Sequence, residues 1–307
     1  MPPTLHLRLP ATSANLGPGF DALGLALSLF LTIDAELSPI TSIAATGRNA
    51  DLCGSLSNNL ILMTYTEVLS HQGLAAPAIA LKLHNEIPLG MGCGSSAAAI
   101  LAGVHLANHF GQLRWSSQQI LDEASNREGH PDNVAACVHG GLTASSTVLT
   151  ASVEPQPTTL TATLGHDLPW RLLLALPTES LSTTTARALL PASYPRADAV
   201  ANVQATALLV SAFALGRPDL LRAAMHDRLH QPFRASACPL LPALLPLAGH
   251  HGIHGVALSG AGPSVLLIAD PILPLDTLQQ AIRSAAGTHL TEILSLTIGQ
   301  PALYQPA

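Results

Sequence analysis

The stretch Pro88-Leu-Gly-Met-Gly-Cys-Gly-Ser-Ser-Ala-Ala-Ala99 decides the fold of this chain. It follows an alternating apolar run, residues 79–84, and precedes a run of helix formers, residues 97–108. The pattern therefore predicts a strand, a glycine-rich loop and a helix, in that order. Glycines let the backbone approach a ligand closely, and the paired serines fall near the helix N-cap, where amide groups favour an anion. A phosphate fits this position, although a tight turn with a serine cap would use the same residues.

The loop differs from two common nucleotide-binding motifs. A Walker A loop would need Gly-Lys-Ser/Thr, and the only lysine of the chain, Lys82, lies on the preceding strand. The Gly-x-Gly-x-x-Gly spacing of a dinucleotide-binding turn is absent from the loop. The loop instead resembles the Pro-x-x-x-Gly-Leu-Gly-Ser-Ser-Ala-Ala phosphate loop of the GHMP kinases, with Cys93 where leucine is usual. The resemblance implies an ATP-binding role for Pro88, Gly90, Gly92, Gly94, Ser95 and Ser96.

Composition narrows the class of protein. The 307 residues are 48% apolar with few charges, as in a folded enzyme with aliphatic cores, most often in two domains. The net charge of −6, with basic residues scattered singly, argues against a nucleic-acid partner. The longest apolar stretch, residues 22–33, is too short to cross a bilayer and lacks the flanks of a secretory signal. We therefore expect a cytoplasmic protein without a membrane partner, whose four widely spaced cysteines are free thiols.

A second cluster of small and polar residues, Pro10-Ala-Thr-Ser-Ala-Asn-Leu-Gly-Pro-Gly-Phe-Asp-Ala-Leu-Gly24, lies between two predicted strands, residues 5–9 and 23–36. Its composition predicts a loop, and such loops often present binding groups. The cluster is similar to the N-terminal signature of the homoserine kinases, one family of GHMP kinases. In that family this segment contacts the amino-acid substrate, which implies substrate-binding roles for Asn15 and Asp21.

A third segment, Arg127-Glu-Gly-His-Pro-Asp-Asn-Val-Ala-Ala136, follows a predicted helix at residues 116–126. Homoserine kinases carry a closely similar segment, whose glutamate binds Mg²⁺ together with a serine of the phosphate loop. The resemblance implies that Ser96, Glu128 and Asn133 are catalytic. It assigns Glu128 and Ser96 to Mg²⁺ and places Asn133 near the transferred phosphoryl group. Whether Asp132 or His130 takes part directly is left open.

Two later segments carry arginines that suit a carboxylate. The run Leu181-Ser-Thr-Thr-Thr-Ala-Arg187 and the tetrapeptide Gln231-Pro-Phe-Arg234 resemble homoserine kinase segments that bind the substrate. Guanidinium forks bind carboxylates in a bidentate manner, so the pair favours an amino acid over a neutral alcohol. The resemblance implies substrate-binding roles for Thr183, Arg187 and Arg234. A glycine-rich turn, residues 259–263, matches the third GHMP motif and places Gly260 near the substrate.

Two weaker signals remain open. Asn59 begins a predicted helix, residues 57–69, and is either a contact of the nucleotide base or a simple N-cap. His226 and His230 have the i, i+4 spacing of a zinc pair on a predicted helix, but no third ligand is evident.

The resemblance covers nearly the whole chain and implies an α+β, two-domain GHMP kinase fold. We expect an ATP-binding domain like domain 2 of ribosomal protein S5 at residues 1–155, and a ferredoxin-like domain at residues 165–307. The implied reaction is the ATP- and Mg²⁺-dependent phosphorylation of L-homoserine in threonine biosynthesis, by a homodimer. Two alternatives remain: a GHMP kinase for another small hydroxylated acid, and an inactive amino-acid-binding regulator.

Overall fold

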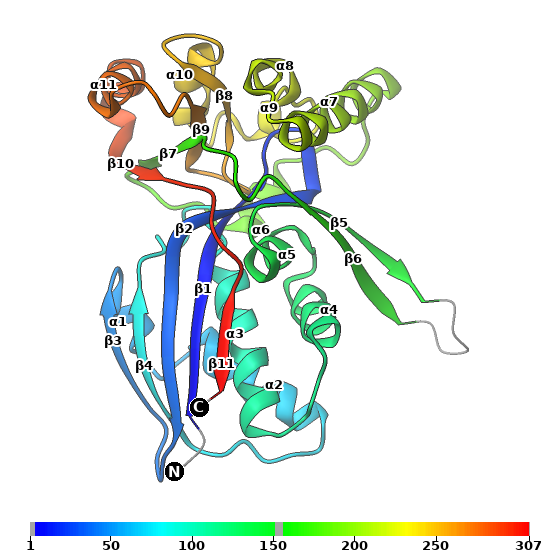
Figure 1. The fold of residues 1–307 in the computed structure, drawn as a ribbon, viewed down its shortest axis with the longest axis vertical. Helices are drawn as coiled ribbons and strands as arrows, with labels where there is room; N and C mark the ends of the chain where they lie inside the picture. Colours follow the sequence, from blue (N-terminus) through cyan, green and yellow to red (C-terminus); the bar gives the residue numbers. More distant parts are fainter. Residues whose placement is uncertain (1–3, 151–155, 307) are drawn as a thin grey trace.

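The computed structural model describes residues 4–150 and 156–306, in which two β-sheets are covered by helices (Figure 1). The first sheet has seven strands in these ranges, with the order β11-β1-β2-β4-β3, β5 on β2 and β6 on β5. The second has four, in the order β10-β7-β9-β8. The strands are β1 Thr4–Asn15, β2 Gly19–Leu37, β3 Ser42–Gly47, β4 Ile79–Asn85, β5 Leu142–Leu149, β6 Pro157–Leu164, β7 Arg171–Pro177, β8 Ile253–Leu258, β9 Val265–Ala269, β10 Leu290–Leu296 and β11 Leu303–Pro306.

The α-helices of the described ranges differ widely in length. They are α1 Ala50–Cys53, α2 Leu60–His71, α3 Ser95–Phe110, α4 Ser117–Glu128, α5 Asp132–His139, α6 Thr183–Ala188, α7 Arg196–Leu215, α8 Leu221–Ala224, α9 Gln231–Arg234, α10 Leu240–Leu244 and α11 Leu275–Ala286.

The first core lies between the large sheet and helices α2 to α5, which cover one of its faces (Figure 1). Strand β1 shows the alternation expected of a half-buried strand, since Leu5, Leu7 and Leu9 point into this core. Helix α3 is buried on most sides, which explains its run of alanines and aliphatic residues. The predicted strand, glycine loop and helix are confirmed as β4, the loop and α3. The core thus holds the N-terminus of α3 at the edge of the domain.

The second sheet is built as β7, helices, β8, β9, α11 and β10, with the spatial order fourth, first, third, second. This is the ferredoxin-like arrangement, so that part of the expected α+β fold is confirmed. Figure 1 shows this sheet and its helices stacked on one end of the first sheet.

The segment predicted as a loop from Pro10 to Asp21 is mostly strand, and that expectation was wrong. Strand β1 continues to Asn15, and only residues 16–18 separate it from β2. Pro10 is tolerated because the pairing with β2 shifts register between Pro10 and Ala11. Thr12 and Ser13 are fully buried, so their polarity misled the sequence analysis: these small side chains lie beneath the site and not in solvent.

Four strands of the first sheet, β3, β5, β6 and β11, lie outside the sequence predictions. The stretch of weak periodicity expected to connect the domains contains β6, which pairs with β5 along its whole length and is rich in β-branched threonine. Strand β11 comes from the far end of the described chain and pairs with β1. The proposed domain limits stay a prediction, but β6 and β11 both belong to the sheet of the first domain.

Arg48 and Glu292 join the two parts through a bidentate ion pair with N–O distances of 2.6 and 2.9 Å.

Within the described ranges, one helix has the length and composition of a membrane span. This is α7, with 20 residues and a mean hydropathy of 1.4 over its most apolar window. Its Asn202 is nevertheless buried and donates hydrogen bonds to the Pro18 carbonyl (3.1 Å) and to Asp227 (3.0 Å). One side of α7 therefore packs on the turn after β1. The apolar residues 22–33, on which the expectation of no membrane partner was based, lie in β2.

The fold predicts a large stability loss when Phe213 of α7 is truncated. Its ring is 1% exposed and meets Trp170 edge-on, with centroids 4.8 Å apart. Phe213→Ala should lower the free energy of unfolding by about 3–5 kcal/mol, because it removes buried area and leaves a cavity. Urea unfolding followed by circular dichroism measures the change. Leu215→Ala, on the same helix but exposed, is the matched control, and an equal loss in both variants would contradict this packing.

Candidate active site

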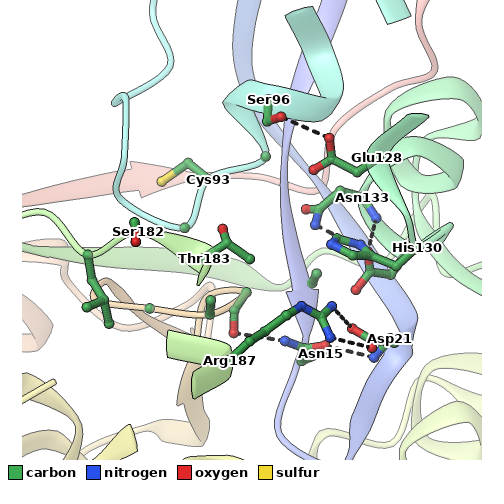
Figure 2. A pocket seen from close by; sticks show the side chains of 18 of the residues that line it. Asn15, Asp21, Cys93, Ser96, Glu128, His130, Asn133, Ser182, Thr183 and Arg187 are labelled. Carbon is green, nitrogen blue, oxygen red and sulfur yellow. Dashed lines mark hydrogen bonds and ion pairs between the residues drawn. The ribbon is translucent and has the colours of Figure 1, made fainter. Parts of the chain in front are cut away.

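A cavity of about 170 Å³ lies where the two parts of the chain meet, and it brings together most of the predicted site residues (Figure 2). Its wall includes residues of the cluster at 10–24, of the glycine loop and of the glycine turn at 259–263. The predicted residues that line it are Asn15, Asp21, Gly90, Gly92, Gly94, Ser95, Ser96, Glu128, Asn133, Thr183, Arg187, Arg234 and Gly260. Pro88 and Asn59, both expected at the nucleotide, are not part of this wall.

The glycine loop reaches the cavity in a shape that side chains would block. Gly94 is the N-cap of α3 with φ of +67°, so Ser95 and Ser96 open the helix with their amide groups toward the cavity wall. At Gly92, a Cβ atom would collide with the carbonyl oxygen of Ser259, whose hydroxyl in turn donates to the Gly92 carbonyl at 2.7 Å. The glycine turn at residues 259–263 thus holds the loop through contacts with the Gly92 backbone.

Ser96 and Glu128 meet at the end of α4. The Ser96 hydroxyl donates to Glu128 Oε2 at 2.9 Å (Figure 2). Desolvation raises the pKa of Glu128 above its ordinary value, although the bond from Ser96 and the neighbouring His130 act in the opposite direction. A partly desolvated carboxylate beside a hydroxyl is a set of hard oxygen donors, which suits Mg²⁺ shared with phosphate oxygens and water. The predicted metal ligands therefore fit the ion.

Asn133 lies in the first turn of α5 and is fixed by its neighbours. Asp132 Oδ1 accepts hydrogen bonds from the Asn133 backbone N–H (2.6 Å) and from its side-chain amide (3.2 Å). The same oxygen lies 2.6 Å from His130 Nδ1. Burial lowers the pKa of His130, but its bond to Asp132 and the nearby carboxylates outweigh this, so the pKa is raised. His130 and Asp132 form a buried pair behind Asn133 and also line the cavity.

The charged residues expected to bind substrate are paired with each other. Arg187 donates to both carboxylate oxygens of Asp21 at 2.7 and 3.0 Å (Figure 2). This bond raises the pKa of Arg187. Arg234 is 1% exposed, and its guanidinium donates to the Ala186 carbonyl (3.2 Å) and lies 3.0 Å from His230 Nδ1. The centroid of the Phe20 ring lies 5.6 Å from the guanidinium carbon of each arginine, within reach of a cation–π contact with both.

Asn15 and Thr183 line the cavity in different ways. The Asn15 amide donates to the Gly260 carbonyl (2.9 Å) and accepts from the Asp21 N–H (3.0 Å). It therefore links the cluster at residues 10–24 to the glycine turn at residues 259–263. Thr183 is the first residue of α6, directly after the N-cap Ser182, which the sequence analysis did not single out. Leu16 and Asp21 have positive φ, and the strained turn between them is what turns the Asp21 carboxylate toward α6.

A second cavity, of about 520 Å³, lies on the other side of the α3 N-terminus. Ser95 and Ser96 belong to both cavities, and Asn59 lines the second one. The Asn59 side chain caps α2 by accepting from the N–H groups of Ile61 and Leu62, at 3.1 and 3.3 Å. The N-cap interpretation is confirmed, and the residue also borders a space large enough for a nucleoside. Cys53 and Ser57 line it too, and neither was predicted, because Cys53 lies in the single turn of α1 and Ser57 in the loop that follows it.

The single helix predicted to carry both His226 and His230 is wrong. Helix α8 ends at Ala224 and α9 begins at Gln231, so His226 and His230 share no helix face. His226 is exposed, whereas His230 is fully buried with Nε2 2.7 Å from the Gly17 carbonyl. The four cysteines are free thiols, as expected.

Comparison with known families assigns this fold and site to a class. The model of the GHMP kinase N-terminal domain matches residues 59–141, which span the phosphate loop and Glu128. The model of the GHMP kinase C-terminal domain matches residues 209–287, which include Arg234 and the glycine turn. Together the two models match more than half of the chain, in the order that the fold requires. The class of protein is therefore a GHMP kinase.

Similar proteins narrow the class further. A homoserine kinase of Solibacter usitatus is 47% identical over 262 residues, which cover 85% of this chain and 84% of that protein. A solved structure of a putative homoserine kinase from Listeria monocytogenes has a TM-score of 0.77 at 28% identity, covering 98% and 99% of the two chains. A homoserine kinase structure from Cytophaga hutchinsonii has a TM-score of 0.79 at 24% identity, covering 98% and 97%, and supports the fold. The chain belongs to the homoserine kinase family.

The raised pKa of Glu128 predicts that Glu128→Gln stabilises the metal-free protein near neutral pH. A raised carboxyl pKa means that folding disfavours the charged form, so the penalty exists above the folded pKa and vanishes below the unfolded one. Glutamine carries no charge and still accepts a hydrogen bond from Ser96. Urea unfolding in a chelator, from neutral to acidic pH, should show a gain that shrinks on acidification. Glu123→Gln, which removes the partner of Arg127 on the same helix, should give no gain. A gain that grew on acidification would contradict the sign of the pKa shift.

Proposed function

We propose that this protein transfers the γ-phosphoryl group of ATP to the hydroxyl of L-homoserine, giving ADP and O-phospho-L-homoserine, a reaction of threonine biosynthesis. The observation that carries the proposal is the shared wall of the two cavities. Ser95 and Ser96, at the N-terminus of α3, separate a space of about 520 Å³ from one of about 170 Å³. A nucleoside in the larger space and a small acceptor in the smaller one would have the phosphates at the helix N-terminus between them.

Ser96 and Glu128 are proposed to hold the Mg²⁺ of the bound nucleotide. When bound, Mg²⁺ neutralises charge on the phosphate oxygens. In the metal-free protein the Glu128 carboxylate has only the Ser96 hydroxyl as its side-chain hydrogen-bond donor among the described residues. A cation would offset the cost of the desolvated negative charge, which is what raises the pKa of Glu128.

The smaller cavity has the charges that an α-amino acid requires. The proposed arrangement places the substrate ammonium group on Asp21 and its carboxylate on Arg187 and Arg234. Since Asp21 and Arg187 are bonded to each other, a zwitterion can replace each partner with its own group of the same sign. An acceptor with only one of the two charges would leave Asp21 or Arg187 without a partner. Asn15, Gly260 and Thr183 are proposed to shape the remaining wall.

The transfer itself is proposed to need positioning more than a general base. Phosphoryl transfer is accelerated mainly by alignment and by electrostatic stabilisation of charge on the phosphoryl oxygens. Asn133 lines the cavity but carries an amide, which cannot remove a proton. Its proposed role is to donate a hydrogen bond near the transferred group. The cytoplasmic location and the homodimer remain expectations from the sequence and the family resemblance.

The direct test is ADP release from MgATP by the purified protein with different acceptors. L-homoserine should give turnover well above the rates with L-serine, mevalonate, D-galactose or no acceptor. Turnover with a different hydroxylated acid would keep the kinase and replace the substrate. Absence of turnover with every acceptor, despite binding of ATP or homoserine by calorimetry, would support an inactive regulator instead.

Loss of Arg187 should affect the amino acid and not the nucleotide. Arg187→Gln removes a charge-assisted contact with the carboxylate, which is worth about 10- to 100-fold in the KM for L-homoserine. The KM for ATP should stay nearly the same, because Arg187 does not line the larger cavity. Arg217→Gln, which breaks a surface ion pair with Asp219, is the control. Steady-state kinetics with each substrate varied in turn measures the effect, and an equal rise in both KM values would argue against this role.

A further inference from the structure

Thr12 lies behind the cavity and contacts both the phosphate loop and Asn133 of α5. The residue is on β1, is fully buried and is not part of the cavity wall. Its backbone N–H donates to the Cys93 carbonyl of the phosphate loop at 3.0 Å. Its hydroxyl donates to Asn133 Oδ1 at 2.6 Å. Thr12 thus contacts the glycine loop through its backbone and Asn133 through its side chain.

The two neighbours of Asn133 fix which way its carboxamide faces. A carboxylate can only accept, so Asp132 Oδ1, 3.2 Å away, must face the amide nitrogen. The amide oxygen must then face Thr12, where the hydroxyl is its donor. A carboxamide nitrogen has two N–H groups, and the bond to Asp132 uses one of them. The other remains for an oxygen atom in the cavity that Asn133 lines.

The phosphate loop is shaped around this hydroxyl. A Cβ atom at Gly94, the N-cap of α3, would overlap Thr12 Oγ1 and would also crowd Asn133 Oδ1. The hydroxyl therefore occupies the space that the missing side chain leaves beneath the helix N-terminus. The position of the Asn133 amide relative to the phosphate-binding amides depends on Thr12.

We propose that Thr12 is a positioning residue for phosphoryl transfer: it holds the Asn133 carboxamide so that its N–H, and not its oxygen, faces the transferred group. The proposal rests on the kinase function proposed above. If the amide rotated by half a turn, its oxygen would face the negatively charged phosphoryl oxygens and would also face away from its only side-chain donor among the described residues. Loss of the hydroxyl should therefore slow the transfer and leave binding of both substrates intact.

The experiment compares Thr12→Val, which has the same shape without the hydroxyl, with Thr12→Ser, which keeps the hydroxyl. Thr12→Val should lower kcat about 10- to 100-fold, the cost of a misplaced group, at nearly constant KM for ATP and L-homoserine. Thr12→Ser should restore most of kcat. Thr64→Val, which removes a buried hydroxyl on α2 away from both cavities, should keep the wild-type kcat.

A double-mutant cycle separates positioning from a general structural role. Asn133→Ala should lower kcat, and adding Thr12→Val to it should cause no further loss, because the lost hydroxyl bonds to Asn133 and the backbone bond to Cys93 is kept. Urea unfolding of each variant controls for stability, and Thr12→Ala replaces Thr12→Val in the cycle if the valine variant does not fold.

Several outcomes would overturn the proposal. These are a wild-type kcat in Thr12→Val, a Thr12→Ser variant as slow as the valine variant, or additive losses in the cycle. Wild-type turnover with L-homoserine tests the proposed function separately. If another acceptor is the substrate, the same variants measured with it still test Thr12.

Discussion

The site depends on the close approach of three backbone segments at the glycine loop. Gly92 packs against the turn that carries Ser259, and Gly94 packs against β1, so neither position has room for a side chain. The Thr12 N–H and the Ser259 hydroxyl both donate to carbonyl groups of the loop. Because contacts from β1 and from the turn after β8 hold the loop in this shape, the proposed phosphate site needs both parts of the chain to be assembled. The ion pair between Arg48 and Glu292 joins the same two parts elsewhere.

The charges around the small cavity stabilise one another while no substrate is bound. Asp21 and Arg187 form a bidentate pair, and the Phe20 ring lies near both Arg187 and the buried Arg234. Desolvation and the nearby Arg187 lower the pKa of Arg234. A charge that is removed from water and left unpaired is costly, so the buried Arg234 and the half-buried Asp21 and Arg187 are stable in one cavity only if they compensate one another. If the proposed zwitterion binds here, the net gain is the difference between two sets of ion pairs, which would favour selectivity over very tight binding.

Much of the fold could be predicted from sequence because its signals are local. The alternation in residues 79–84 and the helix formers after Ser96 predicted β4 and α3 correctly. The buried part of β1 could not be predicted in this way, because Thr12 and Ser13 are small and polar, and their burial is set by α5 and the phosphate loop. The pairing of Asp21 with Arg187 joins residues 166 positions apart, and no local pattern predicts such a contact. The motif residues themselves were predictable, since all but Pro88 and Asn59 line one cavity.

Strand β11 has a consequence for the order in which the protein can form during synthesis. It is the outer neighbour of β1, and it reaches that place only after the chain has built the whole second sheet. On the ribosome, β1 would remain an edge strand with unpaired backbone groups until residue 306 has emerged. The nascent first domain is thus open to pairing with other chains for most of translation. The pairing of β11 with β1 follows the second sheet in the chain, so the half that carries the glycine loop is not a module whose sheet is complete first.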